Sequence, residues 1–315
     1  MSNGEIYRKT FIFSWLRLLV DLLAVILLAA CIAVGFVVTG GSLIGLGAGA
    51  LAGIIVFWLM VHFLTYLLKA GQIAMMTRGV TENRLPENIV AEGKAAVKER
   101  FATVAAYFAI TSAIRGIFAE IANGINALGK VAGGGAAEGV GDTISSVLNT
   151  VVAYLCDCCL GWVFYKKNES AFHSTCEGAV LFFKNWKALV KNLGRTFGIG
   201  LVSLLIIGGA FTALFYRLLG HFPEFVSAMA KALAEVSKDA DGLSDPTVAL
   251  LAVSLLFGII IWSILHNVFV RPFILVGVLR NYMTAGIKNP PQEASFGELD
   301  KLSKKFTKMH NKALA

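Results

Sequence analysis

The sequence predicts an all-α membrane protein: a polytopic bundle of six transmembrane helices in three hairpins, with both termini in the cytosol. Three observations support this fold class. Of the 315 residues, 57% are hydrophobic and only 15% are charged, whereas a soluble domain carries about 25% charged residues. The mean hydropathy is +0.71. The apolar residues also gather into runs of roughly 20 residues or more, the length that crosses a bilayer as a helix.

The first predicted hairpin covers about residues 11–68. In its first span Arg17 and Asp21 are four residues apart, so they share a helical face and can pair. An uncharged, Gly-rich turn leads to the second span, which carries Trp58 and has His62 in its inner part. Ionisable residues inside spans are unfavourable in hydrocarbon and mark pathways or pairs. We therefore treat Arg17, Asp21 and His62 as candidate site residues.

The second predicted hairpin covers about residues 101–165. Its first span contains Arg115 and Glu120, which we expect in the outer half of the bilayer. Its second span is long and apolar, yet it encloses Asp157. A carboxylate in hydrocarbon is unfavourable by about 2.5–3.5 kcal/mol on insertion scales. We therefore expect neighbouring helices to shield Asp157 in a wet or paired pocket.

The third predicted hairpin covers about residues 196–279. Its outer loop, residues 220–245, has apolar residues at helical spacing and should form an amphipathic helix. The last span carries His266 in its inner half and Pro272, which we expect to kink or end the helix.

The basic residues indicate the orientation of the chain. Most Lys and Arg lie in the N-terminal segment and in residues 69–100, 166–195 and 280–315, which pairs of apolar runs separate. Cytosolic loops carry such an excess, and amphipathic helices in them can lie on anionic lipid. The net charge of +8 is therefore no sign of nucleic-acid binding. We expect one integral membrane domain over residues 1–315, in the plasma membrane.

The Cys-x-Cys-Cys cluster of Cys156, Cys158 and Cys159 offers soft metal ligands. Its spacing is not that of a zinc site, and small buried hydrophobic residues are the simpler interpretation. No motif of a serine hydrolase, a metalloprotease or a phosphate-binding loop is present. We therefore expect neither an enzyme nor a cofactor, and these cysteines are only weak candidates for a metal site.

Several short segments occur in an order that resembles the choline transporter-like family. The likeness extends over about half the chain in short fragments. These are Gly41-Ser42-Leu43 with Gly45, Cys158-Cys159-Leu160-Gly161-Trp162, Asn168-Glu169-Ser170-Ala171-Phe172, Cys176 with Ala179-Val180 and Phe183-Lys184-Asn185, and Val268-Phe269 with Val276-Gly277. The resemblance implies a carrier for choline or a related organic cation.

The preferred functional hypothesis is a transporter of a small solute, with anionic lipid as a further partner. A quaternary ammonium binds aromatic faces, and Asp157 could supply the counter-charge. Trp58, Phe164 and Trp262 are further aromatic candidates. The predicted solute or ion pathway consists of Asp157, Asp21, Arg17, His62, His266, Arg115, Trp162 and Tyr154.

Two alternatives remain open. The chain could be a non-transporting membrane scaffold or assembly protein whose basic amphipathic segments bind anionic lipid or a cytosolic partner. In that case the charges within the spans should form closed pairs without a connected cavity. It could also be a redox or metal-handling membrane protein that uses the cysteine cluster.

Overall fold

The computed structural model describes residues 1–101, 104–132, 138–236, 245–292 and 294–314. These residues form helices and turns, and none of them lies in a strand, so the all-α prediction is confirmed. In chain order the elements are α1 (Asn3–Val38), α2 (Leu43–Leu59), η1 (Met60–Thr65), α3 (Tyr66–Thr81), α4 (Ile89–Arg100), α5 (Val104–Ala132), α6 (Glu138–Tyr165), α7 (Ala171–Ser203), η2 (Leu204–Gly208), α8 (Gly209–Leu219), α9 (Pro223–Val236), α10 (Pro246–Leu265), η4 (His266–Val270), α11 (Arg271–Lys288), α12 (Ala294–Leu302) and α13 (Lys304–Leu314).

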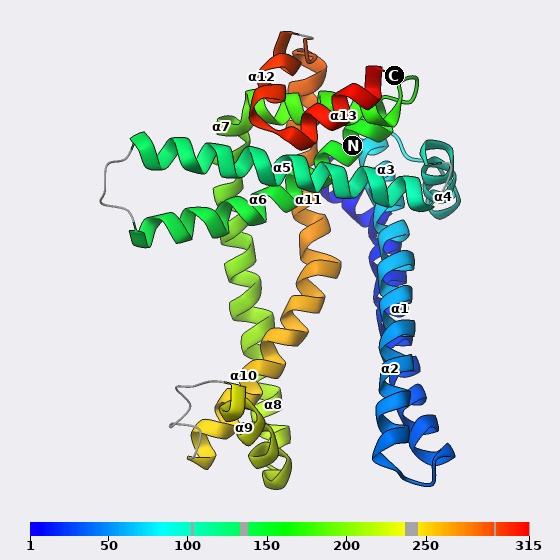
Figure 1. Cartoon of the computed structure of the whole chain (residues 1–315), viewed down its shortest axis with the longest axis vertical. Helices are drawn as coiled ribbons and strands as arrows, with labels where there is room; N and C mark the ends of the chain where they lie inside the picture. The colour runs from blue at the N-terminus through cyan, green and yellow to red at the C-terminus, as the bar shows by residue number, and fades with distance from the viewer. Residues whose placement is uncertain (102–103, 133–137, 237–244, 293, 315) are drawn as a thin grey trace. The chain divides into compact units, whose positions relative to one another are not determined.

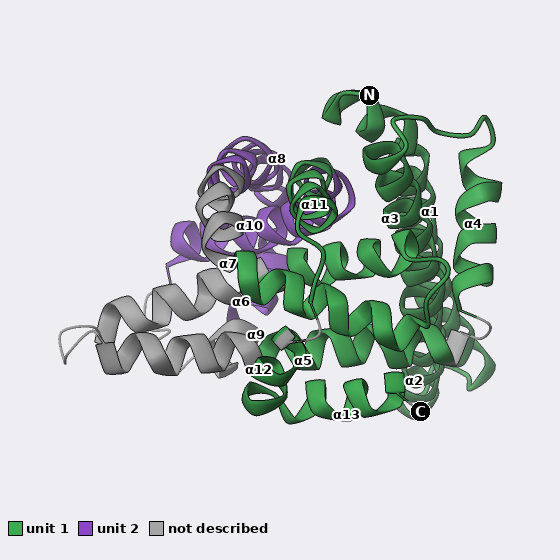
Figure 2. Cartoon of the chain, turned by 90° about the horizontal axis from the view of Figure 1, so that it is seen from above, with its two compact units in different colours: residues 1–193, 273–315 green, residues 194–272 purple. Residues whose placement is uncertain are grey.

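The chain divides into two compact units (Figure 2). Unit 1 consists of Met1–Leu193 and Phe273–Ala315, and unit 2 consists of Gly194–Pro272. The elements η1, η2 and η4 are π-helical turns inside otherwise continuous helices. Such turns are rare and occur frequently at functional sites, and two of them contain the candidate histidines His62 and His266.

Four helices among the described residues are long and apolar enough to cross a membrane. They are Asn3–Val38, Ile44–Thr81, Gly198–Leu219 and Pro246–Lys288. A helix of 36 residues such as α1 is about 54 Å long at 1.5 Å per residue, whereas the hydrocarbon core is about 30 Å thick. The helix is therefore longer than a single crossing of that core requires. The six-span prediction is thus confirmed only as a helical membrane protein with four candidate spans.

The two helices of the first hairpin approach each other at the level of the backbone. Gly45, Gly49 and Gly53 recur every fourth residue along α2 and face α1. A Cβ added to Gly49 would lie 3.1 Å from the Cα of Ile32, and one added to Gly35 would lie 2.8 Å from the Cα of Gly49. Small residues at this spacing permit such close packing between membrane helices.

Much of the buried core of unit 1 lies at one end of this hairpin, where α5 and α6 lie side by side and run across the direction of α1 (Figure 1). We call this region the head. It consists of α4–α6, α12 and α13, together with the adjoining ends of α1, α3, α7 and α11. Large side chains from five of these helices are fully buried there: Met76, Phe118, Trp162, Phe182 and Tyr282. The hydroxyl of Tyr282 donates to the carbonyl of Gly178, which connects α11 to α7.

The head brings Glu120 to the C-terminal tail. Ser303 Oγ donates to Glu120 Oε2 at 2.6 Å, and the backbone N–H of Lys305 donates to the same atom at 3.1 Å. The sequence interpretation had assigned Glu120 to the outer half of a span and the tail to the cytosol. The contact brings Glu120 and the tail together, and α5 is not among the four candidate spans of the described residues.

Two further expectations differ from the structure. The second basic segment, residues 166–195, is not a loop, because α7 begins at Ala171 and continues through this region towards the next span. Of the two outcomes predicted for Pro272, a kink or a helix end, the second does not occur, because the helix continues from Pro246 to Lys288. Pro272 follows the π-helical turn η4, in which the i→i−4 bonding pattern is already interrupted, so that the missing N–H of Pro272 is accommodated.

Unit 2 contains α8, α9 and α10. The amphipathic helix expected within residues 220–245 is present as α9. Its Val226 and Ala230 are buried against Ala249 and Val253 of α10. Asp245 caps α10 by accepting hydrogen bonds from the N–H groups of Thr247 and Val248.

Candidate functional site

A buried ion pair joins α3 to α6. The Nζ atom of Lys69 lies 2.6 Å from Oδ1 of Asp157, and the two side chains are 17% and 8% exposed. Two charges removed from water in this way are stabilised only when they are close and paired. The position of Asp157 agrees with the expectation that the protein shields it, and Lys69 supplies the neighbouring charge.

The cavity at this ion pair is small. Its volume is about 20 Å³, and Tyr66, Lys69, Tyr107, Arg115 and Asp157 contribute to its lining. A volume of roughly 10–15 Å³ holds one water molecule, whereas ligand pockets measure about 300–1,000 Å³. The cavity can therefore hold a water molecule next to Asp157 but is far too small for an organic cation.

Arg115 lines the same cavity as Asp157, although the sequence predicts Arg115 in the outer half of the bilayer and Asp157 in the inner half. Its Nη2 donates to Tyr66 Oη at 2.7 Å, and its guanidinium carbon is 5.3 Å from the centre of that ring. Tyr107 Oη donates to the backbone carbonyl of Tyr66 at 3.3 Å. Lys69, Arg115 and Asp157 thus belong to one polar layer in which α3, α5 and α6 meet.

His62 lies beside this layer between two parallel aromatic rings. Its ring centre is 4.8 Å from that of Trp58 and 4.6 Å from that of Phe108, with interplanar angles of 8° and 9°. The two candidates on α1 lie elsewhere. Asp21 accepts a hydrogen bond from Thr65 Oγ1 at 3.1 Å. Arg17 is buried, with 8% of its surface exposed.

The cysteine cluster lies in the interior of the head. Cys158 and Cys159 are fully buried, Cys156 is 8% exposed, and all three are free thiols. Burial raises the pKa of Cys158 and Cys159 well above the usual value, and it raises the pKa of Cys176 to about 12. Because thiolates rather than thiols react and bind metals, these side chains are suited to packing.

The remaining aromatic candidates of α6 are core residues. Trp162 is 1% exposed, and its Nε1 donates to Oε2 of Glu177 at 2.9 Å. Tyr154 and Phe164 are buried as well. None of these three aromatic residues lines the cavity beside Asp157, whose aromatic lining consists of Tyr66 and Tyr107.

In unit 2, His266 forms a polar group with two neighbours. Its Nδ1 lies 3.1 Å from Ser203 Oγ, and that hydroxyl also accepts a hydrogen bond from Trp262 Nε1 at 3.1 Å. Ser203 Oγ also donates to the carbonyl of Gly200 at 2.7 Å. Because the hydroxyl has only one proton, it accepts from Nδ1 when His266 carries its proton there.

An apolar groove of about 610 Å³ lies between α1, α3 and α4. We call it the α1–α4 groove. Leu19, Val20 and Leu23 of α1 and Leu64 of η1 line one part of it, and the lysines of α4 line another. These lysines, Lys94 and Lys98, are exposed and one helical turn apart.

The sequence identifies Asp157 as a candidate site residue but does not identify its partner, Lys69. Lys69 directly follows the second apolar run and was assigned to a basic loop, and nothing local relates it to a residue 88 positions away. For Glu177, Lys94 and Lys98 the sequence indicates only that they belong to amphipathic segments. The four-residue spacing of Lys94 and Lys98 beside Val90 and Val97 was the available signal for the groove.

No family model matches the chain, and no curated protein or solved structure matches it. The resemblance to the choline transporter-like family therefore stays a prediction.

Proposed function

We propose that the chain is a non-transporting membrane scaffold that binds an anionic phospholipid in the α1–α4 groove. Four spans cross the membrane, both termini and the head lie in the cytosol, and the plasma membrane is the expected location. The observation that carries the proposal is the groove itself, in which an apolar wall along a span continues into a pair of exposed lysines.

The geometry of the groove fits the two halves of a phospholipid. Leu19 and Leu23 on α1 are 56% and 48% exposed, and Leu64 on η1 is 44% exposed, as expected of side chains that face acyl chains. Most buried residues of α1 precede them in sequence, so the groove extends from the bilayer towards the head. Lys94 and Lys98 lie at the head end, where an anionic headgroup would meet them.

The carrier hypothesis is the competing proposal, and the ion pair bears on it. The carboxylate of Asp157 already faces an ammonium at 2.6 Å, and the cavity beside it has room for water only. A closed pair of this kind favours the scaffold. Wild-type proteoliposomes that accumulate choline or another organic cation would contradict the scaffold proposal and favour the carrier.

The lipid proposal predicts a large effect of two charge removals. Each Lys near an anionic surface contributes about 1 kcal/mol, so Lys94→Gln together with Lys98→Gln should weaken binding of phosphatidylglycerol by roughly thirtyfold. The measurement is lipid retention by the purified full chain, detected by native mass spectrometry against phosphatidylcholine. Val20→Trp, which fills the apolar part of the groove, should lower retention of both lipids.

The matched control removes the same charge elsewhere. Lys301 and Lys304 are exposed on α12 and α13 and do not line the groove. Lys301→Gln with Lys304→Gln should leave retention within about twofold of the wild type. Equal losses in the two double variants would show a general charge effect and would contradict a site in the groove.

A further inference from the structure

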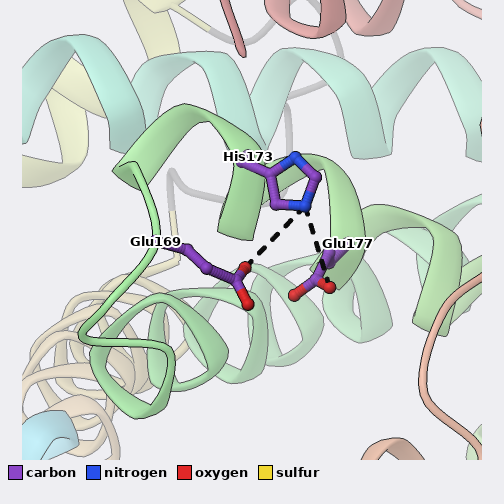
Figure 3. Close-up of side chains that lie close together, drawn as sticks. All are labelled: Glu169, His173 and Glu177. Atoms are coloured by element: carbon purple, nitrogen blue, oxygen red, sulfur yellow. Dashed lines mark ion pairs between the residues drawn. The ribbon is translucent and has the colours of Figure 1, made fainter. Parts of the chain in front are cut away.

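Three side chains with metal-ligating atoms converge at the start of α7, apart from the groove and from the buried ion pair. Glu169 precedes the helix, and His173 and Glu177 follow at intervals of four residues, so all three share one face. His173 Nε2 lies 3.8 Å from Glu169 Oε2 and 3.9 Å from Glu177 Oε1 (Figure 3). The three ligand atoms lie within 4.8 Å of one another.

These separations are close to those of a metal site. Zinc–ligand distances of about 2.0–2.2 Å place neighbouring donors of a tetrahedral site roughly 3.3–3.6 Å apart. Small side-chain rotations of Glu169 and His173 would bring the donors to that spacing. The side chains of Glu169 and His173 are 31% and 38% exposed. The N-terminal turn is fixed by Ser170, whose Oγ accepts from the N–H of His173.

The carboxylates of Glu169 and Glu177 differ in their hydrogen bonding. Glu177 is 7% exposed and its Oε2 accepts from Trp162 Nε1 at 2.9 Å, which directs the other oxygen towards His173. Such a hydrogen bond behind a ligand is typical of metal sites. Oε2 of Glu169 is buried and has no hydrogen-bond donor among the described residues. A buried acceptor without a donor is unfavourable, and this atom faces the imidazole of His173.

The ammonium of Lys166 lies where it would compete with a metal ion for the two carboxylates. Its Nζ lies 2.7 Å from Glu169 Oε1 and 3.4 Å from Glu177 Oε2. One ammonium thus serves two carboxylates, and the guanidinium of Arg100, which donates to the backbone carbonyl of Glu169 at 2.6 Å, is a second cation near Glu169. The side chain of Lys166 is 25% exposed, so it can move into solvent when a divalent cation takes its place.

We propose that Glu169, His173 and Glu177 bind a divalent transition-metal cation, with Zn²⁺ preferred, and that Lys166 leaves the carboxylates when the ion binds. One imidazole and two carboxylates suit Zn²⁺, which such sites hold more tightly than Mn²⁺. Mg²⁺ prefers oxygen ligands alone. Water fills the remaining coordination positions.

The test uses the purified full chain, stripped with a chelator and titrated with Zn²⁺ against a chromophoric competitor. We expect one Zn²⁺ per chain and a rise in thermal stability on binding. Glu169→Gln and His173→Ala should each weaken binding by at least about tenfold. The exposed His221 of unit 2 supplies the control, and His221→Ala should change nothing.

Lys166→Met distinguishes this site from a surface cluster of acids. Because the competing ammonium is removed, binding of Zn²⁺ should become several times tighter. Zn²⁺ affinity that is unchanged in His173→Ala, or weaker in Lys166→Met, would overturn the proposal. If a variant folds poorly, its Zn²⁺-dependent rise in melting temperature gives the same comparison, and Mg²⁺ at equal concentration should produce no rise.

Discussion

Asp157→Asn is expected to destabilise the head by about 3–5 kcal/mol, the range for breaking a buried ion pair from one side. The substitution keeps the size of the side chain but leaves the Lys69 ammonium, 17% exposed, without this counter-charge. Lys69→Met should have an effect of similar size, because it leaves the buried Asp157 carboxylate without the Lys69 ammonium. The measurement is thermal or denaturant unfolding of the purified chain in detergent.

The double variant Lys69→Met with Asp157→Leu separates charge from packing. Replacing both partners by apolar residues removes the uncompensated charge, so most of the lost stability should return. The surface pair Lys9–Glu5 is 44% and 39% exposed, and Glu5→Gln should change stability by less than about 1 kcal/mol. A stable Asp157→Asn variant would show that the ion pair does not organise the head.

Gly49→Leu should disrupt the α1–α2 hairpin. Its Cβ would lie 3.1 Å from the Cα of Ile32 and would also meet the carbonyl oxygen of Cys31. Backbone atoms cannot rotate away, so the helices must separate, and we expect a loss at or above the upper end of the 1–3 kcal/mol range typical of overpacking. The yield of monodisperse protein and its melting temperature measure the effect.

Gly47→Leu is the matched control for this prediction. Gly47 lies on the same helix, two residues away, and an added Cβ meets no atom within 4 Å. The substitution should change stability by no more than about 0.5 kcal/mol. Similar losses at both positions would mean that helix propensity or lipid contact, rather than the approach of α1, explains the sensitivity of Gly49.

The sequence was sufficient for the elements whose signal is local. Uninterrupted apolar runs predicted the helices that remain candidate spans, and apolar residues at helical spacing predicted α9. The run from Phe101 to Ala122 is apolar enough to suggest a span as well. Contacts between residues far apart in the sequence, such as that of Glu120 with Ser303, 183 positions away, show that α5 belongs to the head.

The site was less predictable because it depends on pairs that are distant in sequence. Asp157 was identifiable as an acid that needs a partner, but Lys69 carries no mark that selects it from the other lysines. For Glu169, His173 and Glu177, by contrast, the relation between the residues is local in the sequence. Their four-residue spacing is visible in the sequence, yet metal ligands were sought at the cysteines, whose burial is apparent only in the fold.

The side of the membrane on which α5 lies tests the central claim most directly. Ala119 is exposed on α5, next to the Glu120 contact with the tail. In a Cys31→Ala background, Ala119→Cys should react with a membrane-impermeant maleimide from the same side as Leu302→Cys in the tail, and Lys231→Cys in α9 should react from the opposite side. Labelling of Ala119→Cys together with Lys231→Cys would place α5 across the bilayer and contradict the four-span scaffold.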